Sequence, residues 1–446
     1  MKRNANLILH HIIWRGLYFF SVLILNILIA RFFAAEKSGQ IFFIVNNLAL
    51  VLLLVSISLE SGSAYYIASG NVDPALMARF CLVWSAGASF IALSGWWVAQ
   101  HLTHSTSLTE PGFIPASFLF ISGVLLTTYF TALLYAEHQF GWPNKILSAV
   151  NLFLIILLAL GKNNPDLRSH FILIYFSCFF IQGILLMIIF FIRYKRPEHR
   201  IFPEKSVLFK VLHYSFTALF ANLIYFLVNR IDYWFVQYYC SGKELGNYIQ
   251  ASKLGQMLLI LPAILGSTIF PILSSQKNQG SHFPLPVVLR LLFWVNGFIC
   301  IVILCFGYYL FPFIFGHSYN QMYLLFVLLI PGILSFTMNY PLAAWFSASN
   351  RIGINIKGAG LALIVICAGD FLILPQAGVL SAPAISSAGY FCYYCYTLYL
   401  YRKENPVSWN ELLLIRKSDI QLIRISIGNK LKDPISEPPF VTISAT

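Results

Sequence analysis

Charge is scarce in this chain. Only 10% of its 446 residues are Asp, Glu, Lys or Arg, whereas 59% are hydrophobic and the mean hydropathy is +0.75. A soluble core of this length could not bury so much apolar surface. The composition therefore excludes an ordinary soluble protein and indicates a polytopic membrane protein.

Long polar segments are also lacking. The longest connection that we assign to the outer side, about residues 100–112, carries one acid, Glu110. Membrane glycosyltransferases and polymerases usually need a sizeable loop with catalytic acids, so this class is disfavoured but stays an alternative. The chain is predicted not to be an enzyme and to use no cofactor.

Patterns for metal or nucleic-acid binding are weak. The eight cysteines lie in or directly beside predicted membrane spans, and the CxxC pair Cys392 and Cys395 has no nearby His or acidic residue. Zinc and redox roles are therefore not predicted. The formal net charge is +13, but Lys and Arg occur singly in short connections. Membrane topology explains this pattern better than nucleic-acid binding does.

Twelve apolar runs are long enough to cross a hydrocarbon core of ~30 Å as helices. The first run is expected to remain in place, because Arg15 lies within it and no small-residue cleavage site follows. The fold class predicted is an all-α membrane protein with twelve transmembrane helices. The predicted spans are about 12–30, 40–59, 79–99, 113–135, 143–160, 171–192, 215–239, 246–272, 287–310, 323–346, 357–374 and 379–401.

Basic residues are distributed unequally between the two sides of these spans. With the N-terminus inside, twenty-one Lys and Arg residues are cytoplasmic and five lie outside. The excess predicts that both termini are cytoplasmic. The basic connection from Arg193 to Lys210 falls at the midpoint of the spans. We therefore expect a six-helix lobe at 1–200, a second at 201–402, and a cytoplasmic tail at 403–446.

A weak internal repeat supports this division. A shift of 207 residues aligns Gly39 with Gly246, and AEKSGQIFFIVNN with GKELGNYIQASK. An even number of spans in each half gives both halves the same orientation. The two lobes are then expected to be related by a pseudo-twofold axis along the membrane normal, with a cleft between them.

The stretch from Asn229 to Gln256 carries charge within apolar surroundings. Arg230, Asp232 and Lys253 lie in or at the edges of two long hydrophobic runs. A charged side chain in hydrocarbon is costly unless it faces a partner, a bundle interior or a wet cavity. This stretch is therefore the main candidate for the functional site.

The same stretch resembles a known family. RID, then GKELGNYIQASKLGQ and LPAILGSTIFPILSS, is similar to the start of the second half in O-antigen and polysaccharide flippases of the multidrug/oligosaccharidyl-lipid/polysaccharide (MOP) exporter superfamily. The final hairpin, LILPQAGVLSAPAISS, resembles theirs, and the similarity extends over about residues 8–402. Asp370 departs from the pattern, in which Asn would be more typical. From its place near an outer helix end, Asp370 is expected to be interfacial.

The resemblance implies a flippase for an undecaprenyl-pyrophosphate-linked oligosaccharide, such as an O-antigen repeat unit of lipopolysaccharide, in the bacterial inner membrane. It implies no chemistry on the substrate. A proton or sodium ion is a candidate coupling ion, and a polysaccharide polymerase a candidate partner. The alternatives are a small-molecule or drug antiporter of the same superfamily and the glycosyltransferase or polymerase named above.

Such a substrate needs cations for its phosphates and polar groups for its sugars. Along the seventh span, Ser215, Asn222 and Asn229 recur every seven residues, and Asp232 follows three later. Asn247, Gln250, Lys253 and Gln256 form a slanted polar band on the eighth. The candidate substrate-binding residues are Arg15, Asn222, Asn229, Arg230, Gln250, Lys253 and Gln256.

Several of these residues also have structural explanations. Arg15 shares a face with Asn26 on the first span, but it could instead anchor a helix end at the lipid headgroups. Asn46 and Glu60 are expected to share a face of the second span. Glu60 and Asp232 are the candidate coupling-ion residues, and either could instead be the structural partner of a buried cation.

The charge asymmetry makes a direct prediction about topology. Reporter fusions after Lys243 should report the periplasm, and fusions after Arg200 should report the cytoplasm. Paired alkaline phosphatase and fluorescent-protein reporters at both positions measure this. The reverse pattern would contradict the assigned orientation.

Overall fold

A computed structural model describes residues 2–103, 113–161, 164–194, 203–266, 285–408 and 411–412. The end of the eighth predicted span, residues 195–202 of the predicted basic loop and the tail beyond Leu412 lie outside these residues. All regular elements in the described part of the chain are helices. The all-α fold class predicted from the sequence is confirmed.

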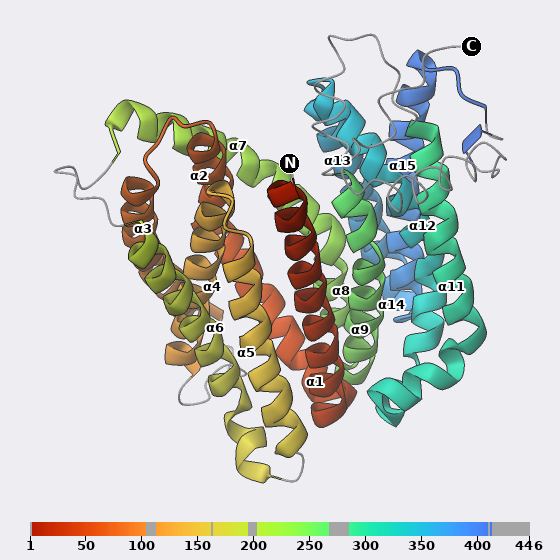
Figure 1. The fold of residues 1–446 in the computed structure, drawn as a ribbon. Coiled ribbons are helices and arrows are strands. Elements are labelled where there is room, and N and C mark those ends of the chain that lie inside the picture. Colours follow the sequence, from red (N-terminus) through yellow and green to blue (C-terminus); the bar gives the residue numbers. More distant parts are fainter. Residues whose placement is uncertain are drawn as a thin grey trace. The chain divides into compact units, whose positions relative to one another are not determined.

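Figure 1 shows the helices in chain order. They are α1 (Lys2–Ser56), α2 (Leu59–Ala68), α3 (Pro74–Thr103), α4 (Phe113–Ala136), α5 (Gly141–Leu160), α6 (Pro165–Arg193), α7 (Lys205–Arg230), α8 (Asp232–Tyr239), α9 (Gly242–Leu258), α11 (Leu285–Phe315), the 3₁₀ turn η2 (His317–Tyr319), α12 (Met322–Ala348), α13 (Ile352–Leu372), α14 (Leu374–Ala377) and α15 (Ser381–Glu404).

Ten stretches among the described residues are long and apolar enough to cross a membrane, and the chain is a multi-pass membrane protein. The first of them, Ile13–Ser56, includes a kink at Ala34 and extends over the first two predicted spans. Helix α15, at the twelfth predicted span, is not one of the ten. The count of twelve therefore stays a prediction.

Local sequence explains several helix starts. Asn164 caps α6 by accepting hydrogen bonds from the backbone N–H groups of Asp166 (2.9 Å) and Leu167 (3.4 Å). Ser241 and Glu244 form a capping box at the start of α9, each side chain accepting from the other residue's backbone N–H. Such caps satisfy N–H groups that have no partner within the helix.

The helices form two compact units, which we describe separately. The N-terminal unit holds Asn6–Ala34 and Gln40–Phe226, and the C-terminal unit includes Ala35–Gly39 and the chain from Leu227 onward. Helix α7 thus contributes to both units, since the division falls between Phe226 and Leu227.

The N-terminal unit is built around the contact between α4 and α6, which lie side by side in Figure 1. A Cβ atom on Gly123 would overlap the backbone at Phe180, and one on Gly183 would lie 2.6 Å from the Gly123 carbonyl oxygen. Small residues let membrane helices approach closely and gain dispersion contacts. Phe120 and Phe176 pack beside this crossing with ring centroids 4.6 Å apart.

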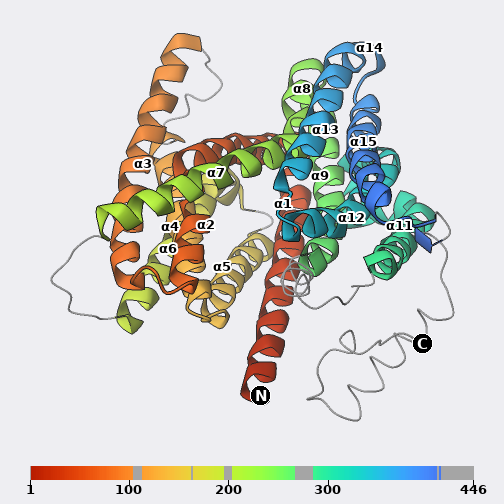
Figure 2. The same ribbon diagram turned by 90° about the horizontal axis from the view of Figure 1, so that it is seen from above.

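The C-terminal unit is centred on α12, α13 and α15, whose neighbouring positions can be followed in Figure 2. Phe336 of α12 stacks on Tyr390 of α15, with ring centroids 4.7 Å apart. Thr397 of α15 donates a hydrogen bond to Asn339 Oδ1 at 2.8 Å. Pro331 and Pro341 both lie inside α12, which continues through them.

Two glycines aligned by the internal repeat touch within the C-terminal unit. After the kink at Ala34 (φ 59°), residues Ala35–Gly39 pack on the start of α9. A Cβ atom on Gly39 would lie 2.6 Å from the Gly246 Cα atom, and one on Gly246 would overlap the Ala35 carbonyl oxygen. No side chain can fit between these backbones without moving them.

We therefore expect Gly246→Ala to lower the apparent Tm of the purified protein, because overpacking a close contact costs about 1–3 kcal/mol. Gly360→Ala is the matched control, since a Cβ atom there would meet nothing within 4 Å. Differential scanning fluorimetry in detergent measures both. Equal melting temperatures for the two variants would show that the backbone contact is not tight.

Candidate functional site

The main candidate site lies at the junction between α7 and α8, in the C-terminal unit. Helix α7 ends at Arg230, Ile231 keeps helical angles (φ −62°, ψ −35°), and Asp232 begins α8. The interruption between the two helices is therefore a single residue with helical backbone angles. Arg230 and Asp232 are held at the two sides of a one-residue interruption.

Asp232 is almost completely buried, with 1% of its surface exposed. Its Oδ2 atom accepts hydrogen bonds from the Tyr248 hydroxyl and from Ser386 Oγ, the latter at 3.0 Å. These partners come from α9 and α15, so one carboxylate joins three helices. The Oδ1 atom has no hydrogen-bond partner among the described residues.

Asp370 is a second buried acid beside this contact. It is fully buried on α13, and neither carboxylate oxygen has a hydrogen-bond partner within the described part of the chain. It lies close enough to Asp232 and Tyr248 to interact with both electrostatically. It lies where α14 follows α13 directly and both helices pack against α8, and the expectation that Asp370 is interfacial stays a prediction.

The two predicted cations of this stretch also come together. Arg230 of α7 and Lys253 of α9 are both half-buried, and they lie close enough to interact electrostatically. Arg230 interacts in turn with Asp232. Gln256 Nε2 donates to the Asn229 carbonyl oxygen at 3.4 Å. Four predicted substrate-binding residues, Arg230, Lys253, Asn229 and Gln256, therefore belong to one neighbourhood.

The rest of the predicted polar band on α9 has different surroundings. Asn247 is buried, donates to the Ser318 carbonyl oxygen at 3.1 Å and accepts from the Gln321 backbone N–H at 3.2 Å. It holds the η2 turn in place. Gln250 is also buried, and its Oε1 atom has no hydrogen-bond partner among the described residues.

The remaining predicted substrate residues lie in the N-terminal unit. The Arg15 guanidinium lies over the rings of Phe19 (5.6 Å) and Tyr135 (5.9 Å). Cation–π contacts of this kind hold a guanidinium without an acidic partner. Asn222 of α7 donates to Ser58 Oγ at 3.0 Å, which connects it to the break between α1 and α2.

That break contains unusual backbone geometry. Ile57 (φ 48°) and Ser58 (φ 54°) both have positive φ, which is costly for a β-branched residue such as Ile57. Two backbone carbonyl oxygens just before the break accept hydrogen bonds from side chains of α3 and α4. Trp84 Nε1 donates to the Val55 carbonyl oxygen at 3.0 Å, and the Tyr129 hydroxyl donates to that of Ser56 at 3.2 Å.

Glu60, the second residue of α2, follows the break. Its Oε2 atom is buried without a hydrogen-bond partner in the described ranges, and its charge interacts with Cys81 and Tyr129. The expectation that Asn46 and Glu60 share one helix face was wrong. The helix is interrupted between them, so a single 3.6-residue period does not connect the two positions.

Sequence reasoning missed Tyr248 and Ser386 as partners of Asp232. Both are common residue types in a membrane helix, and their contact depends on how α8, α9 and α15 pack. A signal did exist for Asp370, an acid within a long apolar run, because such residues are rare and face the protein interior by default.

Comparison with known proteins agrees with this architecture. Residues 145–324 match the model of a family described as polysaccharide biosynthesis protein. No curated protein matches the chain by sequence. The lipid II flippase MurJ in an inward closed conformation has a TM-score of 0.65 at 15% identity, covering 97% of this chain and 94% of that one.

Transporters of the multidrug MATE family have the same fold. An inward-facing MATE transporter of the MOP superfamily has a TM-score of 0.65 at 9% identity, covering 87% of this chain and 94% of that one. A mutant of the Vibrio cholerae MATE transporter VcmN has a TM-score of 0.61 at 12% identity, with coverages of 92% and 100%. These matches confirm the resemblance expected from the sequence. The chain therefore has the fold of the MOP superfamily transporters and, over residues 145–324, the sequence pattern of a polysaccharide biosynthesis family.

Proposed function

We propose that this protein is a flippase that moves an undecaprenyl-pyrophosphate-linked oligosaccharide across the bacterial inner membrane by alternating access, with both termini in the cytoplasm. The observation that carries the proposal is the pairing of Arg230 and Lys253. Two basic side chains from different helices, both half-buried, lie close enough to interact electrostatically in a membrane protein. An anionic group between them would offset their repulsion.

A pyrophosphate headgroup has the chemistry for this position. Arg offers a planar set of N–H donors and Lys a compact ammonium, and both bind phosphate oxygens. The amides of Asn229 and Gln256 lie in the same neighbourhood and suit the hydroxyl groups of a sugar. Arg15, Asn222 and Gln250 are retained as candidate contacts to the carbohydrate.

The comparisons support this substrate class over the alternatives. The matched part of the polysaccharide biosynthesis family, residues 145–324, includes both Arg230 and Lys253. One structure of the same fold is a lipid II flippase, whereas others are multidrug transporters. The O-antigen repeat unit of lipopolysaccharide is our candidate for the sugar, and a polysaccharide polymerase is the candidate that consumes the product.

We further propose that transport is coupled to a proton or a sodium ion at Asp232 and Asp370. Two buried carboxylates close enough to interact are unfavourable when both are ionised, so binding of a cation offsets their repulsion. The partnerless Oδ1 atom of Asp232 and both oxygens of Asp370 are available in the described part of the chain. Glu60 is a second candidate, in the N-terminal unit.

The first functional prediction concerns the headgroup. Lys253→Ala should reduce flipping of a fluorescent lipid-linked oligosaccharide in proteoliposomes by about tenfold or more, since a hydrogen bond to a charged phosphate contributes roughly 1.5–3 kcal/mol. Lys253→Arg should retain part of the rate because the charge remains. Arg230→Ala should behave like Lys253→Ala.

Lys357→Ala provides the control, because Lys357 is exposed on α13, away from the α7–α8 junction. Membrane abundance of each variant is measured in parallel by immunoblot. Wild-type flipping by Lys253→Ala at equal abundance would remove Lys253 from the site. Transport of small organic cations together with no flipping of any lipid-linked sugar would favour the antiporter alternative.

The second functional prediction concerns coupling. Asp232→Asn and Asp370→Asn should each make the initial flipping rate insensitive to imposed proton and sodium gradients, because one carboxylate no longer attracts the cation. The wild-type rate should fall when both gradients are collapsed by ionophores. Ser387→Ala, which removes a hydroxyl next to Ser386 that donates to the Leu328 carbonyl oxygen, serves as a nearby control.

If collapse of both gradients leaves the wild-type rate unchanged, the acids are structural and consumption of the product drives flipping. Glu60→Gln distinguishes the two candidate coupling residues. Loss of gradient dependence only in Glu60→Gln would place coupling in the N-terminal unit instead.

A further inference from the structure

An exposed stripe on α15 leads to a pair of basic residues at the end of the helix. Phe391, Cys395, Tyr399 and Lys403 recur every four residues, and all four are exposed. This spacing keeps them on one face of the helix. An apolar and aromatic face that ends in Arg or Lys is typical of helix segments that meet lipid headgroups.

The stripe ends in a cavity. Beyond α15 the chain turns back, and Arg402 Nε donates a hydrogen bond to the Val407 carbonyl oxygen at 3.0 Å. A cavity of about 700 Å³ lies between this returning segment and the helix. Leu398, Tyr399 and Val407 contribute to its apolar lining, and the side chains of Arg402 and Lys403 contribute its positive charge.

The returning segment is anchored to the C-terminal unit. The Ser408 backbone N–H donates to Glu411 Oε2 at 3.1 Å, and the Glu411 backbone N–H donates to Ser408 Oγ at 3.3 Å. Arg290 of α11 donates to the Glu411 carbonyl oxygen. Leu412 is fully buried in a core cluster with Leu285 and others. The cavity therefore has two fixed walls.

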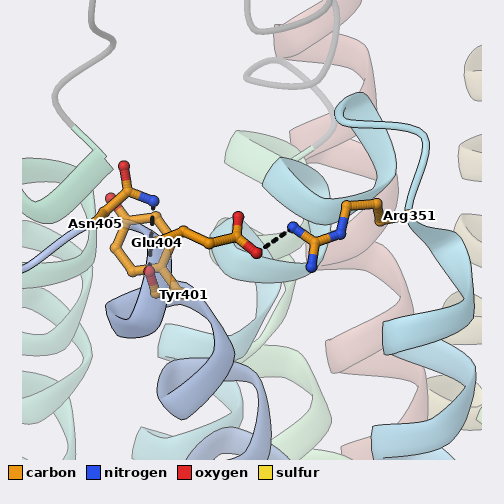
Figure 3. A network of polar contacts seen from close by, with 4 residues as sticks. All are labelled: Arg351, Tyr401, Glu404 and Asn405. Atoms are coloured by element: carbon orange, nitrogen blue, oxygen red, sulfur yellow. Dashed lines mark hydrogen bonds and ion pairs between the residues drawn. The ribbon is translucent and has the colours of Figure 1, made fainter.

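The acidic residue next to Lys403 in sequence is engaged elsewhere. Glu404 forms an ion pair with Arg351, the residue before α13, as Figure 3 shows. Asn405 Nδ2 in the same view donates to the Tyr401 carbonyl oxygen at 3.4 Å. The Glu404 carboxylate is thus balanced by the Arg351 guanidinium, and Arg402 and Lys403 dominate the charge at the cavity.

We propose that this cavity binds an anionic phospholipid, with the headgroup phosphate at Arg402 and Lys403 and an acyl chain along Cys395 and Tyr399. Basic pockets next to membrane helices bind anionic headgroups because each Lys or Arg attracts them, and the apolar wall receives the chain. This site is separate from Arg230 and Lys253 and does not depend on the proposed flipping.

The cavity contains its own chemical probe. Cys395 lines it and is exposed, whereas Cys305 is an exposed thiol on α11 that does not line it. The purified full-length protein in detergent is treated with N-ethylmaleimide, and the alkylation rate of each cysteine is followed by peptide mass spectrometry. Phosphatidylglycerol, phosphatidylcholine and inorganic phosphate are added separately.

We expect phosphatidylglycerol to slow alkylation of Cys395 and leave Cys305 unchanged, while phosphatidylcholine and inorganic phosphate protect neither. Lys403→Ala should raise the phosphatidylglycerol concentration needed for half-protection about fivefold, because it removes the attraction of one basic residue for the anionic headgroup. Lys403→Glu should abolish protection, and Lys357→Ala should leave it unchanged.

Three results would overturn the proposal. Equal protection by phosphatidylcholine would mean that the groove takes any acyl chain. Protection by inorganic phosphate at the same concentration would mean a site for small anions. Unchanged protection in both Lys403 variants would mean that Arg402 and Lys403 only complement the dipole at the C-terminal end of α15.

Discussion

Burial of the Asp232 carboxylate is the constraint on which the C-terminal unit depends. A buried carboxylate is costly unless hydrogen bonds replace its lost water. Tyr248 and Ser386 supply two of these bonds, and each comes from a different helix. The positions of α8, α9 and α15 are therefore fixed to one another by a polar contact inside the unit, and Asp370 lies beside it.

Each unit places an acid directly after a helix interruption. Glu60 is in the first turn of α2 after the break at Ile57 and Ser58, and Asp232 is in the first turn of α8. The N-terminal end of a helix carries partial positive charge, which favours a carboxylate there. Discontinuous membrane helices are a common way to build ion sites, because they bring polar backbone into a protein interior.

The interruption at Ile231 also connects the two proposed activities. Arg230 and Asp232 lie on either side of it, and their charges interact. Under the proposed function, one side of this junction contacts the headgroup and the other binds the coupling ion. A ligand that changes the charge balance on one side therefore alters the energy of the other, which is the physical basis of coupling between sites.

The sequence by itself determined the membrane class and the helical fold, because hydropathy acts locally along the chain. Its intramembrane charge also pointed to the stretch from Asn229 to Gln256 as the candidate site. It also gave the resemblance to MOP flippases. Only tertiary structure decided that Arg230 approaches Lys253, that Tyr248 and Ser386 hold Asp232, and that Asp370 is buried. These contacts join helices far apart in sequence, and helical periodicity shows which residues share a face without showing which helix that face meets.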